Sequence, residues 1–185
     1  MKTDKKVEVS FIDTLYRLHV HDLFSYALHL GFDRETCQDA IHDVFCKLCT
    51  DPIRLDTVKN IRFYLLRALK NRLLDLYKQK KGVSELSLDA IPDELPFTIR
   101  VTVEDELIRS EEEKQMRDKV EDLLRSLSER QREIIYLRYT HKCDYEEIAQ
   151  LMNLSVQSCR QLVHKVLAKL KKASLPVSAL LVFMG

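Results

Sequence analysis

Apolar residues recur along most of the chain at intervals of three and four residues, the spacing of one face of an α-helix. The pattern predicts helices over residues 11–30, 34–49, 58–80, 103–127 and 129–139. Runs of alternating β-branched residues are scarce, so we expect an all-α protein. The apolar positions expected to form the buried side of the first helix are Phe11, Leu15, Leu18, Leu23, Tyr26, Ala27 and Leu30.

The segment Asp144–Leu170 has the outline of a helix-turn-helix. Asp144 and Glu147 form a capping box before a short apolar-periodic stretch, and Asn153 suits the left-handed conformation that ends such a helix. Ser155 then caps a second helix. The residues of this second helix expected to face the core lie at spacings of four, three and four: Cys159, Val163, Val166 and Leu170.

The outer face of this second helix has the chemistry of a DNA reader. Arg, Gln and Ser side chains hydrogen-bond base edges, and Lys holds phosphate. The candidate DNA contacts are Gln157, Ser158, Arg160, Gln161, His164 and Lys165. The plainer alternative is a helical hairpin whose basic face is only solvated. The caps, the turn, the small Ala149 and the charge pattern together favour the helix-turn-helix.

The formal net charge of +1 conceals a strong pattern along the chain. Residues 59–81 contain eight Lys or Arg and one acid, and residues 156–172 contain five and none. Between them, residues 82–113 contain two Arg and ten acids. Two basic segments separated by an acidic one indicate two anion-binding surfaces on one chain.

The organisation predicted from these patterns is two small helical domains joined by an acidic linker. The linker lacks periodicity and contains Pro92 and Pro96. The expected parts are a first helical domain over 8–81, a linker over 82–104, a second helical domain over 105–173 and an apolar tail over 174–185.

Several classes of function are disfavoured by composition. Three Gly leave little room for phosphate-binding loops, and no nucleophile–base–acid set is evident, so we expect a non-catalytic protein without a cofactor. The apolar tail is about half the roughly 20 residues of a membrane span, so no membrane insertion is expected. Five Cys without a secretory signal indicate reduced thiols in the cytoplasm.

Three segments together resemble the extracytoplasmic-function (ECF) class of bacterial sigma-70 factors, the promoter-reading subunits of RNA polymerase. The stretch 37–48, CQDAIHDVFCKL, is similar to region 2.2. The stretch 60–81, NIRFYLLRALKNRLLDLYKQKK, is similar to regions 2.3 and 2.4, and 124–172 is similar to region 4. Nothing resembles regions 1.1 or 3. The Ser-Val-Gln-Ser sequence at the start of the recognition helix and the apolar tail resemble those of family members from Bacteroidetes.

The resemblance implies three binding surfaces. Region 2.2 would bind the clamp helices of the polymerase β′ subunit, through Asp39, His42, Asp43 and Lys47. Regions 2.3 and 2.4 would hold the melted −10 element, with Asn71 at the family's base-capture position; the full set is Arg62, Tyr64, Arg67, Lys70, Asn71, Arg72 and Lys78. Region 4 would read the −35 element of promoter DNA and meet the β flap. An anti-sigma factor is the further partner implied.

The chain departs from the family at several positions. It has no Trp, and the usual Trp slots hold Cys49 and either Phe63 or Tyr64. Asn153 replaces a frequent Gly in the turn. Leu162 replaces a frequent Arg in the recognition helix, which removes a usual −35 contact from that position.

Two alternatives keep the same residues but change the function. His42, Cys46 and Cys49 have zinc-ligand chemistry on one helical face, and a fourth ligand would come from His29, Cys37, His19 or His21. Against a zinc module, Cys46 and Cys49 fill slots that are usually apolar, where a buried thiol needs no metal. The other alternative is a helix-turn-helix regulator with an N-terminal sensing domain. The basic, aromatic helix over 59–81 argues against it, because a sensor needs no second nucleic-acid surface.

Overall fold

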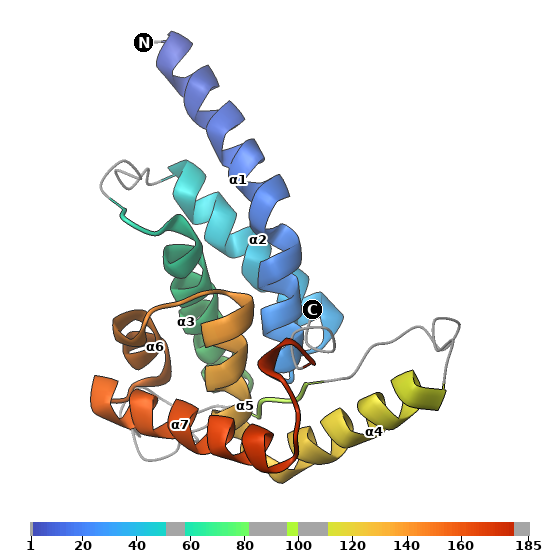
Figure 1. Cartoon of the computed structure of the whole chain (residues 1–185). Helices are drawn as coiled ribbons and strands as arrows, with labels where there is room; N and C mark the ends of the chain where they lie inside the picture. The colour runs from blue at the N-terminus through green and yellow to red at the C-terminus, as the bar shows by residue number, and fades with distance from the viewer. Residues whose placement is uncertain (1, 51–57, 82–95, 100–110, 180–185) are drawn as a thin grey trace. The chain divides into compact units, whose positions relative to one another are not determined.

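The computed structural model describes residues 2–50, 58–81, 96–99 and 111–179, and the chain divides into two compact units, Met1–Asp93 and Glu94–Gly185. Every regular element among the described residues is a helix (Figure 1). The predicted all-α architecture with two helical domains is therefore confirmed. The exact domain boundaries stay predictions, and residues 180–185 of the predicted tail lie outside the described part.

The first unit contains three helices: α1 (Lys2–His29), α2 (Arg34–Thr50) and α3 (Ile61–Lys81). Each packs against the other two. The shared core is made of apolar side chains from all three helices, among them Leu23, Tyr26, Leu30, Cys37, Ile41, Phe45, Leu48, Leu65, Leu66, Leu69 and Leu73. Burial of these side chains supplies most of the favourable free energy that holds the unit together.

Local signals fix where α2 and α3 begin. Gly31 takes a positive φ of 85° after α1, which glycine adopts without steric strain. Asp33 then caps α2, accepting hydrogen bonds from the backbone N–H of Thr36 (2.9 Å) and from its hydroxyl (2.8 Å). Both hydrogen bonds lower the pKa of the Asp33 carboxyl, and the one from the backbone N–H has the larger effect. Asn60 accepts from the backbone N–H of Phe63 (3.1 Å), so α3 begins at Ile61 rather than at the predicted residue 58.

Two predictions about α1 are wrong. The helix begins at Lys2 rather than at residue 11. Phe11 and Leu18 are 46% and 67% exposed, so they are not core residues. Between residues 11 and 18, the buried positions are Ile12 and Leu15, of which Leu15 was predicted.

The second unit contains α4 (Glu111–Ser126), α5 (Glu129–Ile135), a π-helical turn η4 (Tyr136–Thr140), α6 (Tyr145–Met152) and α7 (Val156–Lys172). Helix α7 packs against both α5 and α6. The predicted helix over 129–139 is present, but its last turn widens into the π turn. Residues 103–110 of the predicted helix before it lie outside the described residues.

The caps predicted for the helix-turn-helix are confirmed, and α5 begins with a capping box of the same kind. Ser128 and Gln131 form a capping box at α5, and Asp144 and Glu147 form one at α6. Asn153 ends α6 in the left-handed conformation (φ 51°, ψ 50°). Ser155 accepts a hydrogen bond from the backbone N–H of Ser158 at the start of α7. The four residues predicted to face the core, Cys159, Val163, Val166 and Leu170, are all buried.

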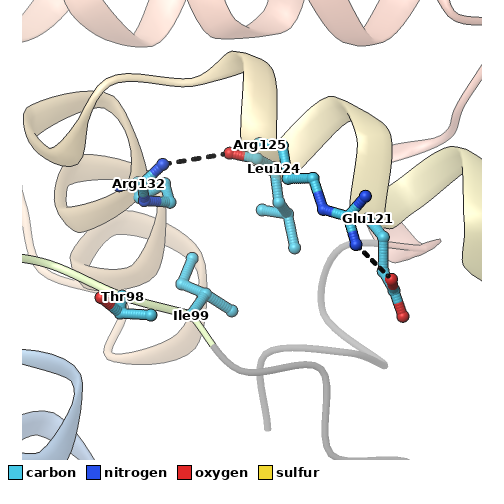
Figure 2. A pocket seen from close by; sticks show the side chains of 6 residues that line it. All are labelled: Thr98, Ile99, Glu121, Leu124, Arg125 and Arg132. Carbon is cyan, nitrogen blue, oxygen red and sulfur yellow. Dashed lines mark hydrogen bonds and ion pairs between the residues drawn. The ribbon is translucent and has the colours of Figure 1, made fainter.

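Arg132 joins three parts of the second unit. Its guanidinium donates hydrogen bonds to the carbonyl oxygens of Phe97 (2.8 Å), Leu124 (3.2 Å) and Leu127 (2.6 Å). Leu124 belongs to the last turn of α4, where carbonyls have no α-helical partner, and its carbonyl also accepts from the backbone N–H of Leu127 (3.2 Å). Figure 2 shows Arg132 across from Thr98 and Ile99 in a pocket that Arg125 and Glu121 also line.

Phe97 lies within the segment predicted to be a linker, yet its side chain is fully buried. Its ring centroid lies 5.5 Å from that of Tyr136. Phe97 therefore belongs to the core of the second unit, although residues 96–99 were predicted to be part of the linker.

Candidate nucleic-acid interface

Most of the predicted −35 contacts lie on the exposed face of α7. Gln157, Arg160, Gln161, His164 and Lys165 are exposed. The opposite face of the same helix is buried against α5 and α6, so these five side chains share the outer side. Leu162, which stands at the family's frequent Arg position, is only partly exposed.

Ser158 differs from the other predicted −35 contacts. Its hydroxyl lies 2.8 Å from the hydroxyl of Ser155, and its backbone N–H donates to the same Ser155 oxygen at 3.0 Å. The side chain is partly buried. In the free protein, Ser158 therefore stabilises the start of α7.

The C-terminal end of α7 is anchored to the rest of the second unit. The ammonium group of Lys169 donates to the carbonyl oxygen of Ser126 (2.7 Å) and to the side-chain oxygen of Gln131 (3.3 Å). These contacts connect α7 to the junction of α4 and α5. The exposed face of α7 therefore belongs to a helix that is capped at its start by Ser155 and anchored near its end by Lys169.

The predicted −10 residues occupy α3 with different exposures. Arg67 and Asn71 are exposed, whereas Tyr64, Lys70 and Lys78 are partly exposed. The remaining two, Arg62 and Arg72, form ion pairs with neighbouring helices. Arg62 lies 2.9 Å from a carboxylate oxygen of Asp22 in α1.

Arg72 pairs with Asp43, which links two surfaces that were predicted separately. Two guanidinium nitrogens of Arg72, Nε and Nη2, lie 2.8 and 2.7 Å from the same carboxylate oxygen of Asp43. Arg72 was predicted to contact the −10 element and Asp43 to contact the polymerase. In the free protein each is the other's partner across α2 and α3. Of the other predicted polymerase contacts on α2, Asp39, His42 and Lys47 are exposed.

Exchanging the charges of this pair tests whether it stabilises the first unit. Arg72→Asp or Asp43→Arg alone is expected to lower the free energy of unfolding by about 1 kcal/mol, because each creates a like-charge contact at a half-exposed site. The double variant is expected to recover most of that loss. Urea unfolding followed by circular dichroism measures all three. A double variant as unstable as the sum of the single ones would show that the pair contributes no coupling.

The zinc alternative finds no ligand set among the described residues, where no three His, Cys, Asp or Glu side chains are arranged to hold a metal ion. His42 Nε2 does lie 3.2 Å from Cys46 Sγ, one helical turn apart. His19, a candidate fourth ligand, has its pKa lowered by burial and then by the nearby Arg62 cation. One argument used against zinc is wrong, however: Cys46 and Cys49 are exposed rather than buried.

The exposure of the thiols predicts their reactivity. Cys37 is buried, and burial raises the pKa of its thiol to about 11, with a smaller contribution from the nearby Asp33 carboxylate. A raised pKa means less thiolate, so at pH 8 iodoacetamide should modify Cys37 roughly 100-fold more slowly than Cys46 or Cys49. Peptide mass spectrometry of a labelling time course gives the three rates. Equal rates would contradict the burial of Cys37.

Known proteins with the same sequence signatures are sigma factors. The family model for "Sigma-70 region 2" matches residues 15–83, and the one for "Sigma-70, region 4" matches residues 117–170. The ECF RNA polymerase sigma factor SigM of Bacillus subtilis (strain 168) is 19% identical over 160 residues, covering 86% of this chain and 93% of SigM. The RNA polymerase sigma factor YlaC of the same strain is 24% identical over 168 residues, covering 87% and 90%.

A solved structure shares the fold. The sigma factor RpoE from Bartonella quintana, crystallised in complex with the anti-sigma factor NepR, superposes with a TM-score of 0.52 at 19% identity. The match covers 88% of this chain and 95% of that one. Among the described helices, none combines the length and apolar content needed to cross a bilayer.

The two matched regions coincide with the two units that carry the basic helices α3 and α7. The resemblance predicted from the motifs 37–48, 60–81 and 124–172 is thereby confirmed. This chain belongs to the sigma-70 family, as a member of its extracytoplasmic-function class.

Proposed function

We propose that this protein binds core RNA polymerase and directs it to promoters, reading the −35 element with α7 and holding the melted −10 strand with α3. One observation supports this most: each of the two units presents a helix with exposed basic and amide side chains. A single helix-turn-helix needs only one such surface to bind duplex DNA. Two surfaces in separate units fit a protein that contacts two promoter elements.

At the −35 element, the exposed face of α7 would lie in the major groove. Arg160 and Gln161 are proposed to contact bases, since guanidinium and amide groups match the donor and acceptor patterns of base edges. Lys165 is proposed to contact phosphate. Gln157 and His164 flank them on the same exposed face. A base contact of this kind contributes roughly 1–3 kcal/mol of discrimination.

At the −10 element, the exposed side chains of α3 would receive unpaired bases. Asn71 is exposed, and its amide both donates and accepts hydrogen bonds. Arg67 is exposed one turn earlier and supplies positive charge for the strand's phosphates. The partly exposed Tyr64 provides an aromatic face, and base–aromatic stacking contributes about 1–3 kcal/mol per base.

The polymerase surface is proposed to lie on α2, through Asp39, His42 and Lys47. Asp43 would join it while still holding Arg72, which would couple the polymerase surface to the DNA surface of α3. We also propose that the protein has no active site of its own, acts in the cytoplasm and is held inactive by an anti-sigma factor. The complex of the similar RpoE with NepR supports this last point by analogy.

Binding to core polymerase separates this proposal from a regulator with an N-terminal sensing domain. Fluorescently labelled full-length protein is titrated with core polymerase in the absence of DNA, and anisotropy is measured. A sigma factor is expected to bind with a Kd below about 1 μM, and a large excess of a second sigma factor should displace it. No binding to core, together with tight binding to duplex DNA by the protein alone, would favour the regulator.

A further inference from the structure

One aromatic ring lies between the proposed −35 reader and the turn that precedes the helix-turn-helix. Tyr145, the first residue of α6, is partly exposed. The guanidinium carbon of Arg160 lies 5.5 Å from the centroid of its ring, and that of Arg138 lies 4.8 Å from it. Both separations are within the range of cation–π attraction. Tyr145 therefore contacts a side chain on the DNA-facing side of α7 from the neighbouring helix.

The other side of this arrangement is fixed by the backbone. Arg138 lies in the π-helical turn η4, and its Nη1 donates to the carbonyl oxygen of Cys143 at 2.7 Å. The N–H of the buried Cys143 in turn donates to the carbonyl oxygen of Leu137 at 3.1 Å. Lys142 between them has a positive φ of 56°, which is uncommon for a residue other than Gly. These contacts hold Arg138, and the ring beside it, in one place.

The contact with Tyr145 reduces the side-chain entropy that Arg160 loses when it binds DNA. An exposed Arg side chain samples many rotamers, and ordering it opposes binding. A cation–π contact restricts those rotamers while leaving the guanidinium N–H groups available, because it uses the charge and not a hydrogen bond. Among the described residues, no carboxylate or carbonyl engages the Arg160 guanidinium. Its donors thus remain available for a base edge.

We propose that Tyr145 is a positioning residue that orients Arg160 for base reading in the −35 element. The proposal rests on the proposed function of α7 and deepens it. Tyr145 need not touch the base itself. Its ring sets the direction from which the guanidinium approaches, so it determines specificity at the position Arg160 reads. The general affinity for DNA depends on the number of charged side chains, which stays the same, so this affinity should not change when Tyr145 is replaced.

The test uses the full chain assembled with core polymerase, on a promoter and its single-base −35 variants. Tyr145→Leu is expected to weaken binding to the intact promoter about threefold to fivefold. Discrimination between bases should be lost at the same −35 position at which Arg160→Ala relaxes specificity. The salt dependence of binding should not change. Tyr145→Phe keeps the ring and should behave like the unchanged protein. Tyr145→Leu combined with Arg160→Ala should bind no more weakly than Arg160→Ala alone.

A second measurement reports on the mechanism without DNA. Nitrogen-15 relaxation of the Arg160 Nε–H group in the free protein should show restricted motion, and Tyr145→Leu should release it. Thermal unfolding of each variant controls for damage to the fold. Uniform weakening on every −35 variant, persisting in the Arg160→Ala background, would overturn the proposal, as would an Arg160 equally mobile in both proteins. If the protein without substitutions showed no preference among the −35 variants, that result would instead overturn the proposed function itself.

Discussion

Replacing Arg132 with alanine is expected to lower the free energy of unfolding of the second unit by about 3 kcal/mol. The guanidinium serves three carbonyl oxygens, of Phe97, Leu124 and Leu127, at 2.6–3.2 Å. Two of these belong to the end of α4 and the residue just beyond it, where carbonyls lack helical partners and a cation is favoured. Without Arg132, all three carbonyls lose the guanidinium donor, although that of Leu124 keeps the backbone N–H of Leu127 (3.2 Å), and the segment around Phe97 loses its tie to α5.

Hydrogen exchange measured by mass spectrometry on the intact protein resolves this loss within the second unit. Peptides from α4 and α5 should lose roughly 100-fold of their protection in Arg132→Ala, and those from α1 to α3 should be unchanged. Arg125→Ala is the matched control, since Arg125 lines the same pocket but is 75% exposed and, among the described residues, pairs with Glu121 and Asp122 on its own helix (Figure 2). Similar effects of the two replacements would show that the three carbonyl contacts contribute little.

Removing the two exposed side chains among the predicted −10 contacts, with Arg67→Ala and Asn71→Ala together, is expected to reduce transcription from a duplex promoter roughly 30-fold to 100-fold. One amide–base hydrogen bond and one cationic contact with the strand together contribute about 2–3 kcal/mol. Because α2 is untouched, affinity for core polymerase should stay the same. The measurement is run-off transcription by the reconstituted enzyme.

A template whose −10 region is already open provides the decisive comparison. If the two side chains act in melting, the double variant should lose less than about fivefold on this template. Arg17→Ala serves as the control, because Arg17 also carries one charge in the first unit but is 78% exposed and, within the described part of the chain, pairs with Asp13 one turn away on α1. Equal losses on the duplex and the open template would contradict a role in opening the promoter.

The helix-turn-helix could be predicted almost completely from the sequence because its signals are local. A capping box can be recognised within four residues of sequence. The αL conformation of Asn153 follows from its residue type, and the buried positions of α7 follow from the helical period of its apolar residues. The same locality explains the confirmed start of α2 at Arg34, after Gly31 and the Asp33 cap.

Features that depend on contacts between distant residues could not be predicted in this way. Phe97 lies in an aperiodic stretch between acidic residues, and only its contact with Tyr136 makes it part of the core. Arg72 and Asp43 are 29 residues apart, so nothing in either segment signals their pairing. The widened turn at η4 has no residue signature, because helix periodicity barely changes when one turn gains a residue.

The exposed Phe11 and Leu18 illustrate a different limit. Both fit a helical period, but a helix of 28 residues that packs against two shorter helices leaves part of its apolar pattern uncovered. A similar limit applies to the predicted contacts on α2, α3 and α7. The exposure of a side chain shows that a ligand can reach it, but it does not identify the ligand. The ligand must be identified by experiment.

The most direct test of the central proposal is transcription in vitro with core RNA polymerase, this protein and genomic DNA, followed by mapping of the start sites. The proposed function predicts start sites that are absent with core polymerase alone and that share one −10 element and one −35 element at constant spacing. Starts that match those of core alone, or that share no upstream sequence, would contradict it.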